Sequence, residues 1–473
     1  MAADLKNRAD RYECGRALRA RSPREAHAEL HGSRDRDPVA ILAQSDAERV
    51  PALLSERYKR MMANPFGFLR GAAAVMATDL ARQPIAGAPV QACGDCHLMN
   101  FGAFNSPEGA ILFDINDFDE TLPGVDFTVD IKRLAASVAV AARAADMSGK
   151  RARSLAAGAV AAYREHMFGL VDLSPLEIWH SRIDLEQQLK HIESPELRRS
   201  LSTVIRHAQH RGLDKDDNFP HLVTGGEPRI ADKPPTIFHI TKKTLGGRKI
   251  DFARGFDLYR ETLTPDRTVL LDRYRLTDVA FKAVGVGSVG TICVVGLFLS
   301  ADGEPLFLQV KQAQRSVLER LSEDLAYRGP QGRRVVEGQR MMQAASDIFL
   351  GWTSDAPLGI DFYVRILKNR RLGAVSELAE QQALSEYARL CGRTLARSHA
   401  RSGDPAVIAG YMGRNGAFDD ALASFAMAYA DQTVRDHAAL VKARGGKVEA
   451  PSKAAAKPAR KSVRAQGRSR SIA

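Results

Sequence analysis

A glycine-rich segment near the middle of the chain restricts the fold more than any other feature of the sequence. Gly285, Gly287 and Gly290 form the pattern G-x-G-x-x-G, and Ser288 occupies one of its variable positions. A parallel Rossmann unit requires a helix directly after such glycines, because the helix N-terminus meets a bound pyrophosphate. Residues 291–298 instead read TICVVGLF, a composition that favours a strand. The sequence therefore predicts a glycine-rich antiparallel hairpin and not a parallel α/β unit.

A lysine follows this hairpin at the end of a further strand. Residues 301–304 (ADGE) are a turn signal, and Lys311 ends the next apolar run, 26 positions after the first glycine (311 − 285 = 26). A glycine-rich hairpin can cover nucleotide phosphates while a lysine on the third strand contacts them, if a carboxylate from the next helix aims that lysine. We expect the helix at residues 334–345 and its carboxylate to be Glu337, with Glu319 as second choice.

Each of these features also has an ordinary explanation. Glycines in a hairpin are often only turn residues, and a lysine at a strand end usually points into solvent. Their order along the chain is glycine hairpin, lysine, helix and then two strands, predicted at 348–352 and 362–367. This order favours a phosphate-binding function over two unrelated structural roles.

A second group of polar residues lies nearer the N-terminus. Asp95 and Asn100 stand five residues apart (100 − 95 = 5) in the loop CGDCHLMN, and Asp114 and Asp117 follow a short apolar run. Phosphoryl transfer needs one carboxylate near the attacking hydroxyl, and an amide and a carboxylate that hold Mg²⁺ against the phosphates. We therefore expect Asp95 to be catalytic, with His97 beside it, and Asn100 to bind the metal together with Asp114 or Asp117.

The same loop contains a C-x-x-C-H pattern, formed by Cys93, Cys96 and His97. This pattern is also the attachment signature of c-type haem, and C-x-x-C pairs occur in zinc and redox sites. Haem attachment would require export, but the first 21 residues carry charges of both signs and no apolar secretion core. A zinc site would require a second ligand pair, and the sequence has no other C-x-x-C. An odd total of five cysteines predicts reduced thiols, so we expect this pair to pack beside the loop.

Composition is that of a globular protein with a basic terminal extension. The 473 residues are 45% hydrophobic and 26% charged, which is sufficient for two lobes or domains. Residues 442–473 contribute +9 (ten Lys or Arg minus Glu449) to the net charge of +12, so the body carries +3 (12 − 9 = 3). We expect this tail to be disordered, and a solubilising extension is favoured over an arm for nucleic acid or an acidic partner. No apolar run approaches the roughly 18 residues of a membrane span, and a cytoplasmic location is expected.

Changes in residue composition and pattern along the chain predict five segments. An N-terminal arm (1–60) precedes a mainly helical lobe with the catalytic and metal residues (61–270), and a β-rich nucleotide-binding lobe follows (271–368). A helical segment (369–441) completes the large lobe before the basic tail (442–473). Helices are predicted at 72–80, 130–146, 150–170, 176–192, from 194, at 334–345, at 376–402 and over most of 404–442. The remaining strands are predicted at 89–92, 101–104, 110–113, 279–284, 291–300 and 305–311.

Four motifs make the chain similar to an uncharacterised bacterial family of unknown function. They are NPFGFLRG at 64–71, CGDCHLMNFG at 93–102, NDFDE at 116–120 and VVEGQR at 335–340. The resemblance covers nearly everything except the tail. Because that family has no established activity, this resemblance by itself implies no function.

The loop also resembles a more distant group, the aminoglycoside and choline phosphotransferases of the protein-kinase-like superfamily. The shared pattern is GDxHxxN, which begins here at Gly94. The resemblance implies that the Asp of this pattern orients the acceptor and that Asn100 binds metal. It assigns the main Mg²⁺ ligand to Asp114 by distance along the chain, or to Asp117 by the motif around it. It further implies that Asp130, at the start of the next helix, braces the loop, which is compatible with a plain N-cap role.

The order of the motifs departs from that of kinase-like proteins. Here the catalytic-type loop comes first, and the glycine segment follows 190 residues later (285 − 95 = 190). We therefore expect an α+β, two-lobed kinase-like fold that is circularly permuted, with the helical catalytic lobe before the small antiparallel β lobe. The helix at 376–402 would then stand where the helix before the catalytic loop normally lies.

The leading hypothesis is an ATP- and Mg²⁺-dependent phosphotransferase that acts on an unknown hydroxyl or amine acceptor. In it the glycine segment covers the nucleotide and Lys311 anchors its phosphates. A nucleotide-binding regulatory protein of pseudokinase type, which docks through its basic tail, is the first alternative. A second is a carboxylate-based metal hydrolase that uses Asp95, His97, Asp114 and Asp117. Nucleotidyl transfer, with the same residues and a reversed nucleotide pose, is a third.

Overall fold

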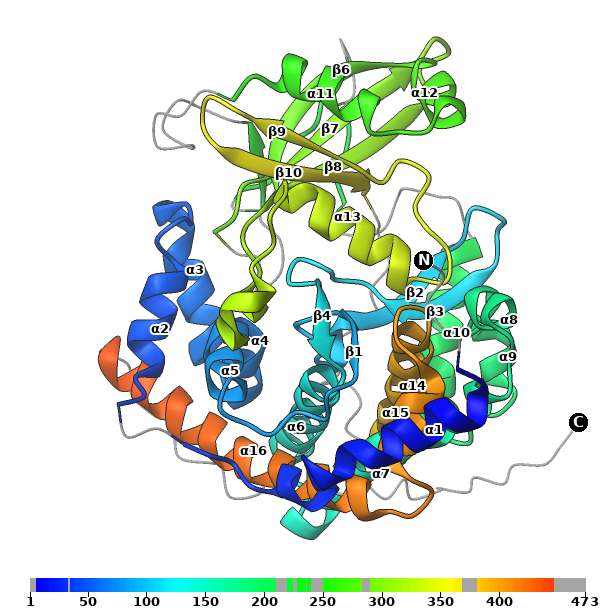
Figure 1. The fold of residues 1–473 in the computed structure, drawn as a ribbon. Coiled ribbons are helices and arrows are strands. Elements are labelled where there is room, and N and C mark those ends of the chain that lie inside the picture. Colours follow the sequence, from blue (N-terminus) through cyan, green and yellow to red (C-terminus); the bar gives the residue numbers. More distant parts are fainter. Residues whose placement is uncertain are drawn as a thin grey trace, which may run out of the picture.

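The computed structural model describes residues 6–32, 35–209, 219–223, 228–234, 236–239, 250–282, 290–367 and 381–445. These residues form an α+β protein with a small sheet-based lobe above a larger, mainly helical lobe (Figure 1). The α+β class expected from the sequence is therefore confirmed.

The large lobe contains most of the helices and two short strand pairs. Its N-terminal helices are α1 (Arg8–Ala17), η1 (Leu18–Ala20), η2 (Arg24–Ala28), α2 (Pro38–Ser45), α3 (Pro51–Met62), α4 (Pro65–Gly71) and α5 (Ala73–Leu80). The strands and the short helix between them are β1 (Pro89–Ala92), η3 (Leu98–Asn100), β2 (Phe101–Asn105), β3 (Ile111–Ile115) and β4 (Leu122–Asp126). The remaining helices are α6 (Thr128–Ala144), α7 (Gly149–Val171), α8 (Pro175–His180), α9 (Leu185–Leu189), α10 (Pro195–Gln209), α14 (Gln381–Ala400), α15 (Pro405–Met412) and α16 (Ala417–Ala443).

Helix α6 forms the centre of the large lobe. All of its residues except the last two are buried, as expected for a helix whose apolar residues, mostly Ala, Val and Leu, surround it on every side. Helices α7, α14 and α16 pack around it and supply most of the main hydrophobic core. Asp130 lies in the first turn of this helix, so the packing of the core also fixes its position.

The two strand pairs of the large lobe are antiparallel. Strand β2 pairs with β3, as the sequence predicts, and opposes Gly102 to Asp114. Strand β1 pairs with β4, which the sequence analysis did not predict because Pro123 and Gly124 interrupt its apolar pattern. The β1–β4 pair places the end of β1 beside residues 117–121, because these residues lead into β4.

The small lobe is built on a six-stranded antiparallel sheet in the order β5-β6-β7-β8-β10-β9. The strands are β5 (Ile237–His239), β6 (Tyr274–Lys282), β7 (Cys293–Ser300), β8 (Pro305–Ala313), β9 (Gly351–Asp355) and β10 (Ile360–Ile366). The helices of this lobe are α11 (Phe252–Glu261), α12 (Pro265–Leu271) and α13 (Gln331–Met342), whereas η4 (Val317–Leu321) and η5 (Glu323–Leu325), which follow β8, pack against α5 and β4 of the large lobe. The predicted turn at residues 301–304 joins β7 to β8, and Gly303 adopts the positive φ (81°) that this turn requires.

The two faces of the small sheet have different partners. Leu308 and Val310 on β8 face α11, whereas Lys311 between β7 and β10 points the other way and contacts Asp119 of the large lobe. Side chains alternate between the faces of a strand, so Leu308 and Val310 lie on one side of β8 and Gln309 and Lys311 on the other. Helix α13 lies between this sheet and strands β1 and β4 of the large lobe (Figure 1).

Two predicted elements and one predicted boundary differ from the structure. The helix predicted at 176–192 is two short helices, α8 and α9, because Asp184 forms a β-bridge with Leu112 and caps α9 instead of continuing a helix. The strand predicted at 348–352 begins at Gly351, since Asp347 caps the turn before it. The small lobe also includes β5, α11 and α12, which precede the boundary predicted at residue 270.

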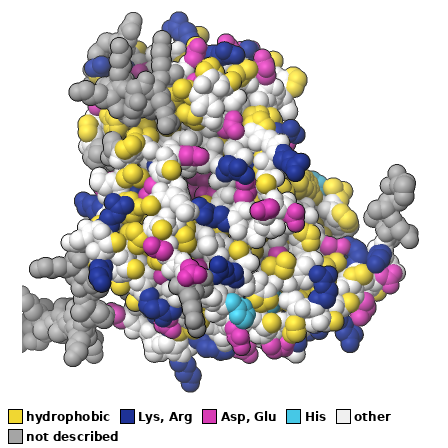
Figure 2. Space-filling view, turned by 60° about the vertical axis from the view of Figure 1, so that its left-hand side comes forward, with side chains coloured by type: hydrophobic (Ala, Val, Ile, Leu, Met, Phe, Trp, Pro, Cys, Tyr) yellow, Lys and Arg dark blue, Asp and Glu magenta, His cyan; other side chains and the backbone are white. Residues whose placement is uncertain are grey.

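The surface of the described residues is mixed in character. Figure 2 shows basic and acidic side chains interspersed with apolar ones on the face it displays, and no extended patch of a single charge. Residues 446–473, which carry most of the predicted basic tail, lie outside the described residues. Within the described part of the chain, no helix has the length and apolar character of a membrane span.

Candidate functional site

The loop at residues 93–100 leaves β1 through a tight glycine turn. Gly94 has a φ of 87°, and a Cβ added to it would lie only 2.5 Å from the carbonyl oxygen of Glu120. Only glycine avoids both the backbone strain and this contact. The turn is therefore pressed against the segment that carries Asp117, Asp119 and Glu120.

The carboxylate of Asp130 fixes the backbone of this loop. It accepts hydrogen bonds from the backbone N–H groups of Cys93 (2.6 Å) and Gly94 (2.9 Å). It also contacts Nε2 of His399 at 3.2 Å, and Tyr163 contacts the other nitrogen of that histidine. Asp130 is fully buried, so this network fixes the loop backbone, and the bracing role expected for it is confirmed.

Asp95 points from the loop into a pocket and keeps 16% of its side chain exposed. Arg133 of α6 holds one of its oxygens, with Nε at 2.9 Å and a terminal nitrogen at 2.5 Å. His97 lies 3.7 Å from the other carboxylate oxygen, and its Nδ1 accepts the backbone N–H of Met99. The carboxylate is therefore oriented by an arginine, with the predicted histidine beside it.

Asn100 connects the loop to the next acidic segment. Its side-chain amide donates to the carbonyl oxygen of Asp95 at 2.7 Å, which turns the amide nitrogen toward the loop. The backbone carbonyl of Asn100 accepts the backbone N–H of Asn116 at 2.8 Å. These two contacts fix the spacing between Asp95 and the residues that follow Asn116.

Lys311 reaches this acidic segment from the small lobe. Its Nζ lies 2.7 and 3.0 Å from the two carboxylate oxygens of Asp119, and Tyr363 on β10 donates to the same carboxylate at 2.6 Å. Burial alone would lower the pKa of Lys311, but the charge of Asp119 raises it above its ordinary value. Burial alone would raise the pKa of Asp119, but Lys311, Tyr363 and Arg365 hold it below its usual range. The two lobes are thus joined by a charged pair whose lysine is only 2% exposed.

The predicted carboxylate partner of Lys311, Glu337, is wrong. Glu337 lies on the exposed face of α13 and pairs with Arg333 one turn earlier. Arg334 faces inward instead, and donates to the backbone carbonyls of Asp119, Thr121 and Gln314. The second choice, Glu319, pairs with Arg315. Helix α13 therefore contributes Arg334, which holds the backbone of Asp119. Its carboxylate Glu337 does not pair with Lys311.

The two alternatives for the main metal ligand differ in their surroundings. Asp114 is fully buried and accepts hydrogen bonds from Arg397 (2.6 Å) and from the backbone N–H of Ala344 (2.9 Å). These contacts make it a structural ion pair between β3 and α14 and do not fit a metal ligand. Asp117 lines the same pocket as Asp95, and one of its oxygens accepts the N–H of Asp119.

This pocket lies where the two lobes meet and brings acidic and basic side chains together. Its acidic members are Asp95, Asp117, Asp119 and Glu120, and its basic members are Arg49, Arg57 and Arg70. The small lobe adds Thr291, Gln312 and Gln314, and η4 adds Val317. Burial, together with the nearby charges of Asp119 and Asp95, raises the pKa of Glu120 to about 7.

The glycine segment is described only at its end. Gly285, Gly287 and Ser288 lie outside the described residues, whereas Gly290 is described and has a φ of 101°. The carbonyl of Gly290 accepts the backbone N–H of Val50 at 2.6 Å. The end of the glycine segment therefore contacts the N-terminal arm and adjoins Thr291 in the pocket.

Cys93 and Cys96 contribute to the packing of the loop. All five are unpaired, and Cys93 and Cys96 are fully buried. Among the residues that the structure describes, no group of three or more His, Cys, Asp and Glu side chains is arranged to hold a metal ion by itself. Asp117 lines the inter-lobe pocket, whereas Asn100 is buried and is not among the residues that line it. Carboxylate and amide oxygens suit Mg²⁺, which usually takes only one or two protein ligands and completes its shell with water and phosphate.

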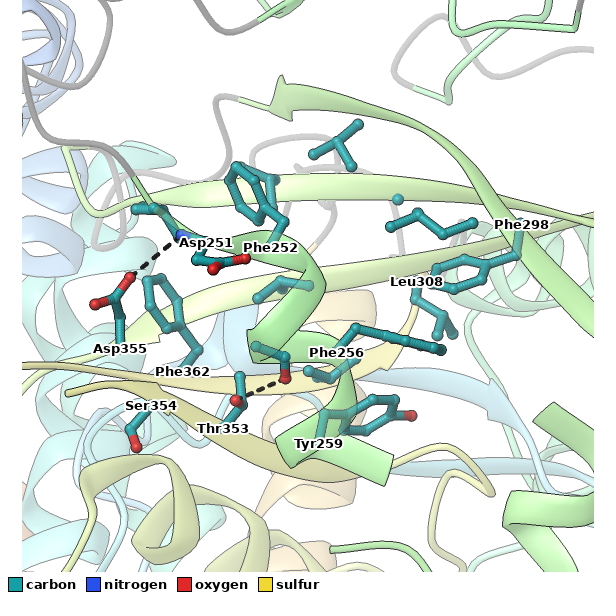
Figure 3. Close-up of a pocket in the computed structure, with 18 residues that line it drawn as sticks. Asp251, Phe252, Phe256, Tyr259, Phe298, Leu308, Thr353, Ser354, Asp355 and Phe362 are labelled. Carbon is teal, nitrogen blue, oxygen red and sulfur yellow. Dashed lines mark hydrogen bonds between the residues drawn. The ribbon is translucent and has the colours of Figure 1, made fainter. Parts of the chain in front are cut away.

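A second pocket lies within the small lobe and contains none of the predicted site residues. It is bounded by α11 and the sheet and is lined by apolar side chains such as Phe252, Phe256 and Phe298, with Asp251 and Asp355 near one end (Figure 3). The backbone N–H of Asp251 contacts Asp355 at 3.4 Å across that end. The carboxylates of Asp251 and Asp355 accept backbone N–H groups at this end, and the rest of the lining is mainly apolar.

The fold and the inter-lobe pocket thus define a two-lobed α+β protein with a pocket that contains four carboxylates, one of which, Asp119, pairs with the buried Lys311. The chain belongs to a family of uncharacterised proteins conserved in bacteria (DUF2252), whose model matches residues 49–443. Comparison with curated proteins and with solved structures gives no match.

Sequence analysis missed several residues of this site. Asp119, the lysine partner, belongs to the motif NDFDE that the analysis selected, but only Asp117 was chosen from it. Arg133 occurs in the sequence three residues after Asp130, on the face of the same helix that meets the loop, which is a signal that could have been used. The pocket arginines come from the N-terminal arm and α4, and nothing in their local sequence relates them to the loop.

Proposed function

We propose that this protein is an ATP- and Mg²⁺-dependent phosphotransferase with a circularly permuted kinase-like fold. The observation that carries the proposal is the contact between Lys311 and Asp119 beside the pocket that contains Asp95 and Asp117. Two segments that are 192 residues apart in the sequence thereby meet, and they carry the phosphate-binding and metal-binding residue types respectively.

The order of elements in the small lobe supports this proposal. Strand β6, the glycine segment, β7 and β8 with Lys311 are followed by helix α13 and then by β9 and β10. Protein kinases also place the phosphate-binding lysine on the third strand, after the glycine-rich loop and before a helix. In the large lobe, a loop with Asp95 and Asn100, a hairpin and then Asp117 follow one another, as in the catalytic half of such enzymes.

Asp95 and Asp117, which line the pocket, and Lys311 and Asn100, which do not line it but contact Asp119 and Asp95, have distinct roles in this proposal. Asp95, oriented by Arg133, accepts the proton of the acceptor hydroxyl or amine as its oxygen or nitrogen attacks the γ-phosphorus and ADP leaves. Lys311 has three N–H donors, and Asp119 takes at most two of them, so one remains for a nucleotide phosphate. Asn100 and Asp117 would hold Mg²⁺, which would neutralise phosphate charge during transfer.

Catalysis in this proposal is electrostatic and positional. No residue forms a covalent intermediate, and the barrier is lowered by groups that are already oriented before the substrate binds. Arg133 and Arg334 provide this orientation by holding the side chain of Asp95 and the backbone of Asp119, and Asp130 fixes the backbone of Cys93 and Gly94 just before Asp95.

The test is a comparison of ATP binding with ATP turnover. We expect Asp95→Asn to abolish phosphate transfer, while calorimetry gives a Kd for Mg-ATP within about twofold of that of the wild type, since Asp95 contacts the acceptor. Asp117→Asn should instead weaken Mg-ATP binding. Asp172→Asn, an exposed carboxylate in a surface ion pair, is the matched control and should change neither quantity.

Loss of ATP binding in folded Asp95→Asn would contradict the role assigned to that residue. Binding of Mg-ATP without turnover for any hydroxyl or amine acceptor would favour a regulatory protein of pseudokinase type. Metal-dependent ester hydrolysis without ATP would favour the hydrolase. Release of pyrophosphate instead of ADP would favour nucleotidyl transfer.

A further inference from the structure

The apolar cavity between α11 and the sheet of the small lobe has no part in the function proposed above. Five strands, β6 to β10, contribute residues to its floor. Leu308 and Val310 of β8 line this floor, whereas Lys311 of the same strand contacts Asp119 on the other side of the sheet. None of the residues that line the cavity also lines the inter-lobe pocket. The cavity is therefore a separate candidate site on the opposite face of the same sheet.

The charged groups of this cavity lie at one end and are all negative. Asp251, the N-cap of α11, and Asp355, the last residue of β9, lie next to each other at this end (Figure 3). No lysine, arginine or histidine is among the described residues that line the cavity. Neither carboxylate forms an ion pair within the part of the chain that the structure describes. The protein thus places two negative charges beside an apolar cavity without a cation in contact with them.

The two carboxylates have backbone partners, but these partners leave acceptor capacity. One oxygen of Asp251 accepts the N–H of Arg254 at 3.1 Å. One oxygen of Asp355 accepts the N–H of Leu358 at 3.2 Å, and the other accepts the N–H of Asp251 at 3.4 Å. Each ionised carboxylate offers about four acceptor sites, so these three contacts use less than half of about eight sites. The N–H groups are also neutral, so they leave both charges in place for a cation.

The rest of the cavity is apolar and small. Phe298 and Leu308 lie at the end away from the carboxylates, and Phe252, Phe256 and Phe362 line the space nearer to them (Figure 3). The cavity has a volume of about 60 Å³. One water-sized group takes about 10–15 Å³, so the cavity has room for about four to six such groups. It therefore fits a short apolar chain with its polar group at the carboxylate end.

The competing explanation is that the cavity is only a packing defect in the core of the small lobe. Tyr259, Phe298 and Leu308 are indeed buried in one hydrophobic cluster of this lobe. A packing defect, however, is enclosed and lined by apolar groups throughout. Here Asp251 is exposed and Phe252 is half-buried, so the cavity reaches the surface at the end that carries the charges.

We propose that this cavity binds an organic cation, an alkyl ammonium whose chain of about four to six carbons lies against the sheet and whose ammonium group contacts Asp251 and Asp355. The ammonium group has three N–H donors for the carboxylate oxygens, and burial of each methylene group strengthens binding about fourfold. A nucleotide or a fatty acid would bring its negative charge beside two carboxylates, which disfavours both ligands. This proposal does not depend on the phosphotransferase activity, because the two sites share no residue.

The experiment titrates the full chain with hexylammonium at pH 7, where the amine is charged, and follows binding by ligand-observed NMR. We expect saturable binding, and an affinity about fifteenfold lower for butylammonium, which has two fewer methylene groups. Hexanol carries the same chain on a neutral group and should bind about threefold more weakly than hexylammonium. Hexanoate, which is negatively charged, should bind more weakly than hexanol.

A leucine at position 255 tests whether the ligand lies in the cavity. Gly255 of α11 lines the cavity, and a Cβ there would have only Thr353 Oγ1 within 4 Å, at 3.8 Å. Gly255→Leu should therefore fold, fill part of the cavity and weaken hexylammonium binding about tenfold or more, as expected for the loss of space for two methylene groups. Ala253→Leu is the matched control, because Ala253 is an exposed residue of the same helix outside the cavity. It should leave hexylammonium binding unchanged.

An asparagine at position 251 tests the role of the charge. Asp251→Asn keeps an oxygen that caps α11, so the helix is retained. This variant should weaken hexylammonium binding about threefold and leave hexanol binding unchanged. Asp257→Asn, at an exposed position of α11 that does not line the cavity, is the control and should change neither affinity.

Thermal denaturation establishes that each variant is folded. Absence of saturable hexylammonium binding to the wild type overturns the proposal, and so does unchanged binding in folded Gly255→Leu. If hexanol or hexanoate binds as tightly as hexylammonium, the assignment of a cationic ligand is wrong. If Gly255→Leu does not fold, an unchanged ratio of hexylammonium to hexanol affinity in Asp251→Asn overturns the proposal, and a fall in that ratio supports it.

Discussion

Replacing Lys311 with methionine would leave the carboxylate of Asp119 without its cation at the junction of the two lobes. The lysine is 2% exposed and Asp119 keeps a quarter of its side chain exposed, so water can reach the carboxylate only in part. Breaking a buried ion pair by removing one partner typically costs about 3–5 kcal/mol. Because Asp119 is partly exposed and keeps the hydroxyl of Tyr363, we expect a loss of about 3 kcal/mol, near the lower end of that range.

The double variant Lys311→Met/Asp119→Asn separates this penalty from the loss of packing. Asparagine is neutral and its oxygen can still accept the Tyr363 hydroxyl, so the buried charge disappears along with the lysine. We expect the double variant to recover about 1–2 kcal/mol of the stability that the single variant loses. Urea denaturation at pH 7, followed by far-UV circular dichroism, measures both values.

The pH dependence gives a second readout for the same pair. Lys311, Tyr363 and Arg365 outweigh burial and hold the pKa of Asp119 below its ordinary value of about 3.9, so the pair stabilises the fold above about pH 4 and loses this effect as the pH falls through the lowered pKa. In Lys311→Met, protonation of Asp119 removes the unpaired charge. The difference in stability between wild type and variant should therefore be largest near neutral pH and shrink toward pH 3. A Lys311→Met protein as stable as the wild type at pH 7 would refute the reasoning.

Three further predictions concern the loop and its surroundings. Gly94→Ala should lose at least about 2 kcal/mol more stability than Gly109→Ala, because both glycines have positive φ but only the Cβ at Gly94 would contact Glu120; thermal and urea denaturation compare the two. Asp130→Asn should lose about 2–3 kcal/mol in the same assay, since one amide oxygen cannot replace a carboxylate that accepts two backbone N–H groups, and an unchanged Tm would contradict its bracing role. Burial raises the pKa of Glu120 to about 7, so the native state binds more protons than the unfolded state between about pH 4.5 and 7, and wild-type stability falls as the pH rises through this range. The difference in unfolding free energy between Glu120→Gln and wild type should therefore shift in favour of the variant by on the order of 2 kcal/mol when the pH is raised from 5 to 8. The same difference at both pH values would contradict the raised pKa.

Much of the fold could be predicted from local patterns. The hairpin of β2 and β3, the run of strands from β6 to β8 and the long helices α6 and α7 all follow from periodicity and turn residues that act over a few positions. The helix predicted at 176–192 could not be corrected in this way, because a tertiary β-bridge between Asp184 and Leu112 ends it. Local sequence does not contain that contact.

The partner of Lys311 could not be predicted from the sequence for a different reason. In α13 the inward positions Val335, Gly338 and Met342 follow helical spacing, and Gly338 lies against Thr121 of the large lobe. This phase directs Arg334 inward and Glu337 outward, so closer attention to periodicity could have excluded Glu337. The identity of the true partner, Asp119, depends on how two distant segments meet, which periodicity does not determine.

In the acidic motif NDFDE, too, the role of each residue depends on how distant segments meet. Asp117 and Asp119 both line the inter-lobe pocket, whereas Phe118 between them is buried in the main core. Which of the two acids meets the lysine is decided by the register of β8 against β10, because Tyr363 and Lys311 lie opposite one another and both reach Asp119.

The most direct test is a crystal structure of this protein with Mg²⁺ and a non-hydrolysable ATP analogue. We expect the β- and γ-phosphates between Nζ of Lys311 and the carboxylate of Asp117, with the cation on Asp117 and Asn100. A nucleotide bound in the apolar pocket under α11, or no nucleotide in the inter-lobe pocket at saturating concentration, would contradict the claim that these two segments bind one triphosphate.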